Sequence, residues 1–123
     1  MAGRARDLGV ASEELACTFL IANGYRILDR NVRLGPGEID VVTQLGSTFV
    51  FVEVKCRASG GDPLTAAAER VTARKQFLLR ATALRYLASR GIPADVECRF
   101  DVVLVTGVGR PGRARLAQLK DAF

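Results

Sequence analysis

The sequence predicts an α/β fold in one domain, and three of its features lead to this prediction. A stripe of apolar and small side chains at helical spacing runs through residues 8–20. Four stretches of strand length follow it along the chain, at 25–32, 38–44, 48–56 and 98–106. A second helical region separates the third of these stretches from the fourth. With 123 residues, 49% of them hydrophobic, the chain is long enough for one core, so we expect a single domain over residues 1–123.

The first predicted elements are a helix and a strand. The stretch "GVASEELACTFLIANG" (9–24) carries the apolar stripe, and Gly24 at its end supplies a C-terminal stop. "YRILDRNV" (25–32) predicts the first strand, and "RLGPG" (33–37) predicts the turn that follows it.

The next two strands are predicted to form a hairpin. Residues 38–44 and 48–56 flank "LGST", in which Gly46-Ser47 suits a two-residue type II′ turn. After the hairpin, "RASGGDP" (57–63) predicts a flexible loop, and Asp62 before its proline predicts a helix start.

The remaining elements are helices and then strands. A helical stretch runs to Gly91, with a break near Val71 where Thr72 is expected to cap a second, longer helix. "CRFDVVLVT" (98–106) predicts an uninterrupted apolar strand, and the tail 113–123 predicts an edge strand. The expected order is therefore α-β-β-β-α-β, with one additional strand at the end.

The composition limits the chemistry. The chain has no histidine, which excludes Ser-His-Asp and Cys-His machinery and any histidine metal site. Its three cysteines are far apart and form no C-x-x-C pair, which argues against a disulfide framework and a structural zinc site. Catalysis would have to come from carboxylates, lysine, arginine, hydroxyls or thiols, and carboxylates favour a hard cation such as Mg²⁺.

No apolar run approaches the roughly 18 residues of a membrane span, and "MAGRARDLG" lacks the apolar stretch of a signal peptide. We therefore expect a cytoplasmic protein that does not bind a membrane.

The positive charge is concentrated in one region. The net charge is +5, and the pI is near 9.6. Residues 57–90 hold seven basic side chains against two acidic ones, and a further cluster of three arginines lies at 110–115. A phosphate backbone is the natural complement of such a charge, while a solvated helix face is the alternative.

Four charged residues lie on the two strands of the predicted hairpin. The two-residue turn places Asp40 opposite Glu53, and Glu38 opposite Lys55, on one side of the sheet. Glu38 and Lys55 could form a cross-strand ion pair. Asp40 and Glu53 are like charges, so they would either share a proton or bind a divalent cation. A metal site and a buried structural network both stay open from this geometry.

These residues resemble a known signature. Asp40, a gap of twelve residues, and then Glu53-Val54-Lys55 are similar to the active-site motif of the restriction-endonuclease-like, or PD-(D/E)xK, nuclease superfamily. Ile39 stands where that motif has its proline.

A second resemblance covers nearly the whole chain. Five blocks in order resemble the YraN-type bacterial family, itself similar to archaeal Holliday-junction resolvases: "GYRILDRNVR", "GEIDVV", "FVFVEVKCR", "RFDVV" and "DAF". The resemblance implies a restriction-endonuclease-like core, with a central mixed sheet flanked by helices. Asp101 belongs to the "RFDVV" block, but Arg99 shares its strand face, so we expect an ion pair there and no catalytic role.

The resemblance also implies a metal site and a reaction. Asp40, Glu53 and the Val54 carbonyl would bind Mg²⁺ (or Mn²⁺), with Glu13 of the first helix helping directly or through water. On a helical wheel Glu13 lies at the border of the apolar stripe, where a merely solvated glutamate is equally common. Lys55 would orient or deprotonate the attacking water.

Contacts to nucleic acid are implied as well. Lys75 matches a lysine position of the family and would hold a phosphate adjacent to the scissile one, and Arg57 and Arg74 are similar candidates. For each of the three, plain surface solvation is the alternative.

Three classes of function follow. The leading one is a metal-dependent nuclease that hydrolyses structured DNA, such as branched or junction DNA. The second is a nucleic-acid-binding domain of the same fold with little or no hydrolysis, and the third is a module that binds proteins. The acid-acid-lysine set favours the first class over the second, and the basic excess favours both over the third. A homodimer stays open.

Overall fold

The computed structural model describes residues 2–57 and 64–123. In chain order its elements are α1 (Ala2–Ala22), β1 (Arg26–Leu34), β2 (Gly37–Leu45), β3 (Thr48–Arg57), α2 (Leu64–Glu69), α3 (Ala73–Ser89), β4 (Cys98–Thr106) and β5 (Arg115–Leu119). The predicted α/β fold and its element order are confirmed. Most of the loop 57–63, including the expected helix start at Asp62, lies outside the described residues. Within those residues, no helix combines the length and hydropathy that a membrane span requires.

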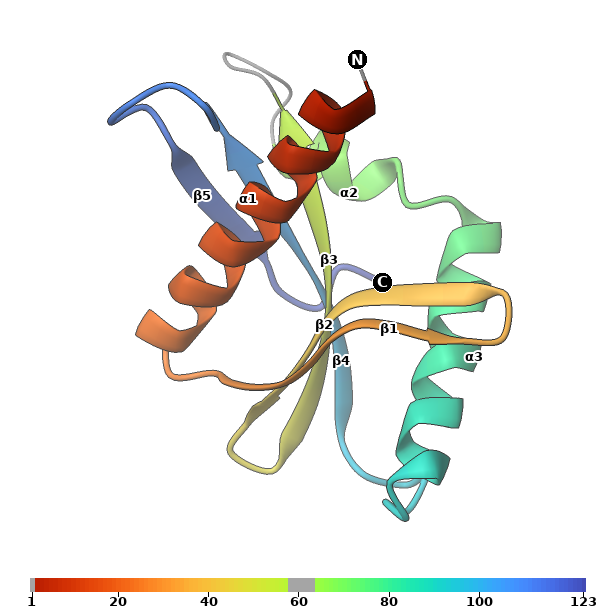
Figure 1. Cartoon of the computed structure of the whole chain (residues 1–123). Coiled ribbons are helices and arrows are strands. Elements are labelled where there is room, and N and C mark those ends of the chain that lie inside the picture. The colour runs from red at the N-terminus through yellow and green to blue at the C-terminus, as the bar shows by residue number, and fades with distance from the viewer. Residues whose placement is uncertain (1, 58–63) are drawn as a thin grey trace.

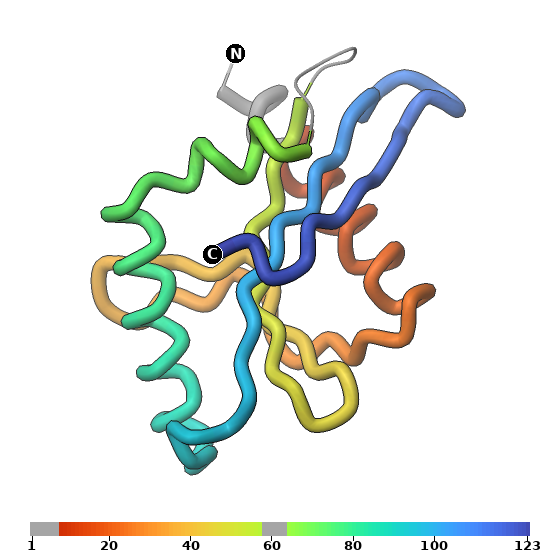
Figure 2. The backbone as a smooth tube through the Cα atoms, turned by 180° about the vertical axis from the view of Figure 1, so that it is seen from behind, coloured from red at the N-terminus to blue at the C-terminus, as the bar shows by residue number. Residues whose placement is uncertain are grey.

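The five strands form one mixed sheet in the order β1-β2-β3-β4-β5. Strands β3 and β4 are parallel, while every other neighbouring pair is antiparallel. Helix α1 covers one face of the sheet and α3 the other, as Figures 1 and 2 show from opposite sides. The tail forms the edge strand β5, as predicted.

Helix α1 begins at Ala2, earlier than the predicted start at Gly9. The preceding residues are mostly alanine and arginine, which favour helix, and they contain no proline to stop it. The end is as predicted. Gly24 has φ +91°, and the Tyr25 N–H donates to the Leu20 carbonyl, the hydrogen bond typical of a helix closed by glycine. The buried face of α1, which includes Ala16 and Leu20, packs on valines of β2, β3 and β4.

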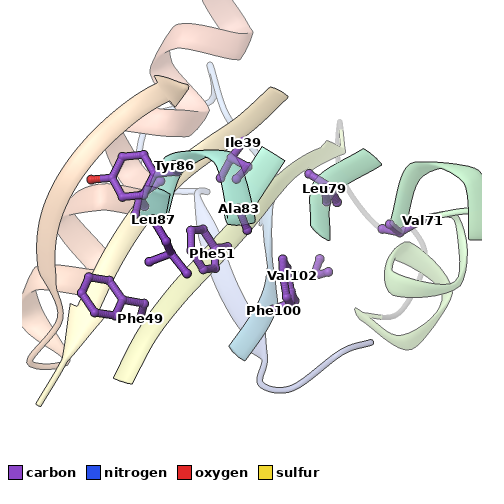
Figure 3. Close-up of a cluster of buried hydrophobic side chains, with 11 residues drawn as sticks. Ile39, Phe49, Phe51, Val71, Leu79, Ala83, Tyr86, Leu87, Phe100 and Val102 are labelled. Atoms are coloured by element: carbon purple, nitrogen blue, oxygen red, sulfur yellow. The ribbon is translucent and has the colours of Figure 1, made fainter. Parts of the chain in front are cut away.

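The opposite face of the sheet carries the larger core, shown in Figure 3. Phe51 of β3 lies in the middle of this core. The rings of Phe51 and of Tyr86 on α3 pack edge-to-face, with their centroids 6.3 Å apart. The predicted break before α3 is confirmed, because Thr72 is the N-cap and its side chain accepts the Lys75 N–H. Val71, just before the cap, is buried in the same core.

The hairpin β2–β3 has the predicted register, but only over part of its length. Leu45 faces Thr48 across the turn, Gly46 has φ +62°, and the register continues to Val41 opposite Val52. There the ladder stops, so the predicted facing pairs Asp40–Glu53 and Glu38–Lys55 do not form.

The strands separate because β2 turns away from β3 with β1, toward α3 (Figure 1). Gly37, at the start of β2, packs so closely on α3 that a Cβ there would lie 2.7 Å from the Leu78 carbonyl oxygen. Ile39 consequently joins the core on the α3 side. In an unbroken antiparallel ladder the Val54 N–H would bond to the Ile39 carbonyl. Instead it donates to Asp40 Oδ2 at 2.8 Å.

Candidate active site

A cavity of about 370 Å³ opens beside the point where β2 leaves β3. Its walls come from the start of β2, from Glu53 of β3 and from the first turns of α3. Both Asp40 and Glu53 line it, so the two acids are brought together although their strands no longer pair. The expectation that they share one side of the sheet is confirmed, by a different local geometry from the one predicted.

Asp40 is held in a position that disfavours its ionised form. Burial, and next the negative charge of Glu53, raise the pKa of its carboxyl to about 7, although the Val54 N–H acts in the opposite direction. Glu13 raises this pKa further and Lys75 lowers it. Asp40 is therefore a carboxyl that a nearby cation would stabilise in its charged form.

Glu53 is buried, with its side chain 7% exposed, and two lysines meet it at one oxygen. Lys75 Nζ lies 2.7 Å from Glu53 Oε1, and Lys55 Nζ lies 3.7 Å from the same atom. The ion pair between Lys55 and Glu38 that the predicted register allowed does not form, since each residue has another partner. Glu38 faces Arg33 across the β1–β2 ladder and forms its ion pair there, at 2.9 Å.

The two lysines differ in their electrostatics. Burial lowers the pKa of Lys55, and its hydrogen bond with Lys75 lowers it further, against the opposing effect of Glu53. Burial also acts to lower the pKa of Lys75, but the hydrogen bond and charge of Glu53 outweigh it, so the pKa of Lys75 is raised. Lys75 therefore keeps its proton and positive charge more strongly than a free lysine, while Lys55 loses its proton more readily than a free lysine.

The remaining candidates lie around this centre. Glu13 is partly buried on α1, and Arg30 of β1 approaches it at 4.0 Å, while Glu14 is exposed, as expected. Arg74 is exposed and lines the mouth of the cavity. Arg57 lies at the end of β3, where its Nη1 donates to the Cys56 carbonyl. Within the described residues, no group of three acidic or cysteine side chains converges as a ready-made metal site.

The prediction assigned Lys75 to a substrate phosphate and missed its contact with Glu53. Two signals in the sequence point to that contact. A buried acid needs a cationic partner, and only three of the chain's 18 basic residues are lysines, of which two lie next to Glu53. The chain uses arginine almost everywhere else.

The predicted ion pair of Asp101 with Arg99 is confirmed. Asp101 is fully buried, and Arg99 binds both of its carboxylate oxygens at 2.8 and 2.9 Å. Gln118 and the Asp121 N–H also donate to it, at 2.8 and 2.9 Å. The network joins β4 to β5 and to the C-terminal residues.

Comparison with known proteins gives one consistent family. The model of the uncharacterised protein family UPF0102 matches residues 12–105. A UPF0102 protein of Symbiobacterium thermophilum is 47% identical over 118 residues, which cover 96% of this chain and 97% of that protein. A UPF0102 protein of Frankia alni is 46% identical over 126 residues and the full length of both chains. One from Geobacter sulfurreducens is 41% identical over 116 residues, 94% of this chain and 88% of that protein.

Proposed function

Since the chain belongs to the uncharacterised protein family UPF0102, the YraN-type family that its sequence blocks resemble, we propose a function from the chemistry of its cavity. The proposal is a metal-dependent nuclease that hydrolyses phosphodiester bonds of structured DNA, such as branched or junction DNA. One observation carries it. Asp40 and Glu53 line one cavity, and burial together with the charge of Glu53 raises the pKa of Asp40 to about 7.

The donors at this cavity fit a hard divalent cation. Carboxylate oxygens are the ligands that Mg²⁺ and Mn²⁺ take, usually with water completing the shell. Asp40 and Glu53 are the residues that would hold it. Glu13 contributes negative charge that Asp40 senses, and Val54 fixes the Asp40 carboxylate through its N–H while its carbonyl is the further ligand implied by the resemblance. Bound there, the ion would polarise the scissile phosphate and acidify a water molecule.

The lysines supply the protein's own part of the reaction. Lys55 Nζ lies beside Glu53, and burial lowers its pKa, so it is suited to orient the attacking water and to take up its proton. Arg74 is exposed and lines the cavity, so it would contact a phosphate of the DNA backbone. Lys75 and Arg74 line the cavity and belong to the region 57–90, whose basic excess has the sign that attracts DNA.

A second candidate function is a nucleic-acid-binding domain that hydrolyses little or nothing. The ion pair between Lys75 and Glu53 favours it, because an internal ammonium already satisfies the buried acid. In this case the charged groups of Asp40, Glu53, Lys55 and Lys75 form a structural network, and the protein only binds nucleic acid through its basic surface.

The test is cleavage of branched, nicked and single-stranded DNA during a titration with Mg²⁺ or Mn²⁺. We expect cleavage by the wild type and a loss of at least about a hundredfold for Asp40→Asn, because a ligand of the catalytic ion is worth several kcal/mol. Glu38→Gln is the matched control, since Glu38 lines the same cavity but pairs with Arg33. A wild type that binds DNA and cleaves none of these substrates with either ion would favour the second candidate.

A further inference from the structure

The ion pair between Lys75 and Glu53 points to a role that the phosphate contact implied by the resemblance does not include. We propose that Lys75 is an exchangeable internal cation, which holds Glu53 while the site is without metal and passes to a DNA phosphate when a divalent cation takes Glu53. This inference rests on the proposed function. It adds to that function a coupling between the metal site and the substrate.

The geometry around Glu53 requires an exchange. Its Oε1 has the Lys75 ammonium at 2.7 Å and the Lys55 ammonium at 3.7 Å. A divalent cation on the same buried carboxylate would place three cationic groups within a few ångströms of one another. Repulsion at such distances is strong in a partly desolvated site. At least one ammonium group therefore has to leave.

Lys75 is the lysine that can leave. Its side chain is 40% exposed, against 20% for Lys55, and it starts from the first turn of α3 at the cavity mouth. Lys55 belongs to β3, where it pairs with Leu104 of β4. The flexible four-carbon stem of a lysine lets its ammonium move several ångströms without any change in the backbone. Arg74, the preceding residue, lines the same mouth. Once released, Lys75 therefore lies where an incoming phosphate would meet positive charge.

The exchange makes the two ligands cooperative. A metal that displaces Lys75 frees an ammonium for the phosphate, and a phosphate that attracts Lys75 frees a carboxylate for the metal. Linkage requires the effect to be reciprocal, so metal increases the affinity for DNA by the same factor by which DNA increases the affinity for metal. The chain would thus bind metal weakly by itself and more tightly on its substrate.

The first experiment measures Mn²⁺ affinity without DNA, by electron paramagnetic resonance of the free ion, at a pH above the Asp40 pKa of about 7. Lys75→Met removes the competing ammonium, so we expect Mn²⁺ to bind about tenfold more tightly or better. Arg74→Met removes one positive charge from the same mouth but leaves the ion pair with Glu53, and solvent screening should keep its effect below about threefold. Lys75→Gln repeats the test with a polar side chain, in case the methionine variant does not fold.

The second experiment measures the coupling in the wild type. The affinity for a short branched DNA is compared with and without Ca²⁺, which takes the same kind of oxygen ligands. We expect Ca²⁺ to tighten DNA binding in the wild type and in Arg74→Met, and to lose most of this effect in the Lys75 variants.

The outcomes separate the two proposals. Equal Mn²⁺ affinity in the wild type, Arg74→Met and the Lys75 variants would overturn the exchange and leave the metal site standing. Metal binding by none of these proteins would overturn the metal site and the exchange with it.

Discussion

The surroundings of Asp40 disfavour its ionised carboxylate, although the proposed metal site needs the residue in that ionised form. The side chain takes the Val54 N–H that a continued ladder would have given to a main-chain carbonyl. Its carboxylate is thereby fixed at the point where two strands separate, next to Glu53. The raised pKa means that holding the ionised carboxylate here costs free energy, and the attraction of a bound cation would offset that cost.

The first prediction concerns the pH dependence of stability without metal. The pKa of Asp40 is about 7 in the folded chain, against an ordinary value of 3.8. Its contribution to stability is therefore fully present below about pH 4 and is lost as the pH rises through the folded pKa. The loss has an upper limit of about 1.4 kcal/mol per pH unit.

Asp40→Asn should remove this slope while keeping an acceptor for the Val54 N–H. Urea unfolding across this pH range, in the presence of a chelator, measures it. The free energy of unfolding of the variant should exceed that of the wild type by a margin that grows with pH. A margin that stays constant from pH to pH would contradict the assigned pKa.

At the scale of the elements, the start of α3 positions Lys75. The Thr72 hydroxyl caps the helix by accepting a hydrogen bond from the Lys75 N–H at 3.2 Å. Thr72 and Lys75 both line the cavity. The cap therefore links helix stability to the placement of a charged group in the site.

The second prediction tests this cap. Thr72→Ala should lower the free energy of unfolding by about 1 kcal/mol, because a helix N–H loses its acceptor. Thr72→Ser keeps a hydroxyl and should lose less than half of that amount. Chemical denaturation of the three proteins decides the comparison, and an equal loss in both variants would mean that the cap does not act through its hydroxyl.

Strand β4 carries another buried acid, Asp101. Asp101 accepts hydrogen bonds from Arg99, Gln118 and the Asp121 N–H, and Tyr25 joins the network through Arg99 at 2.6 Å. The Asp121 N–H joins this network to the end of the chain, and none of the network's residues is among those that line the cavity.

The third prediction separates this network from the site. Asp101→Asn breaks a buried ion pair and leaves Arg99 uncompensated, so the free energy of unfolding should fall by roughly 3 kcal/mol. At a temperature where the variant is folded, its affinity for Mn²⁺ should equal that of the wild type. A stable variant with weakened metal binding would place Asp101 in the site and contradict its structural assignment.

The elements also show what the sequence could reveal. The turn at Gly46-Ser47 defined the β2–β3 register correctly as far as Val41 and Val52, because a two-residue turn determines which residues face each other. Arg99 and Asp101 were predictable as a pair because they lie two apart on one strand. Local patterns of this kind carry over directly from sequence to structure.

Two features of the site could not be predicted in the same way. The separation of β2 from β3 depends on the packing of Gly37 against α3, a contact between distant parts of the chain. The ion pair of Lys75 with Glu53 likewise joins residues that are 22 positions apart in the sequence, with helix α2 between them along the chain. Periodicity and spacing within one element contain no information on either contact.

At the scale of the whole molecule, the excess of positive charge is the feature that bears on partners. Residues 57–90 alone carry an excess of five positive charges, which equals the net charge of the whole chain. Helix α3 provides most of this excess and also forms one wall of the cavity. DNA that reaches the acids would therefore meet this helix.

The fourth prediction follows from that placement. Affinity for DNA should fall steeply with salt concentration, since each neutralised phosphate releases a counterion. Arg74→Glu should weaken binding much more than Arg26→Glu, which reverses an exposed charge at the start of β1, opposite Gln44 of β2. Fluorescence anisotropy with labelled DNA over a salt series measures both effects. Equal losses in the two variants would mean that the charge acts diffusely and that α3 forms no specific surface.

The central claim is that Asp40 and Glu53 together bind a divalent cation, and thermal melts of two proteins test it most directly. The wild type and Asp40→Asn are melted in chelator and then in millimolar Mg²⁺ or Mn²⁺. The account predicts that either ion raises the melting temperature of the wild type. It also predicts that Asp40→Asn melts at or above the wild-type temperature in chelator and does not respond to the ions. A wild type whose melting temperature ignores both ions, together with a destabilised Asp40→Asn, would contradict the claim and identify the pair as a structural network.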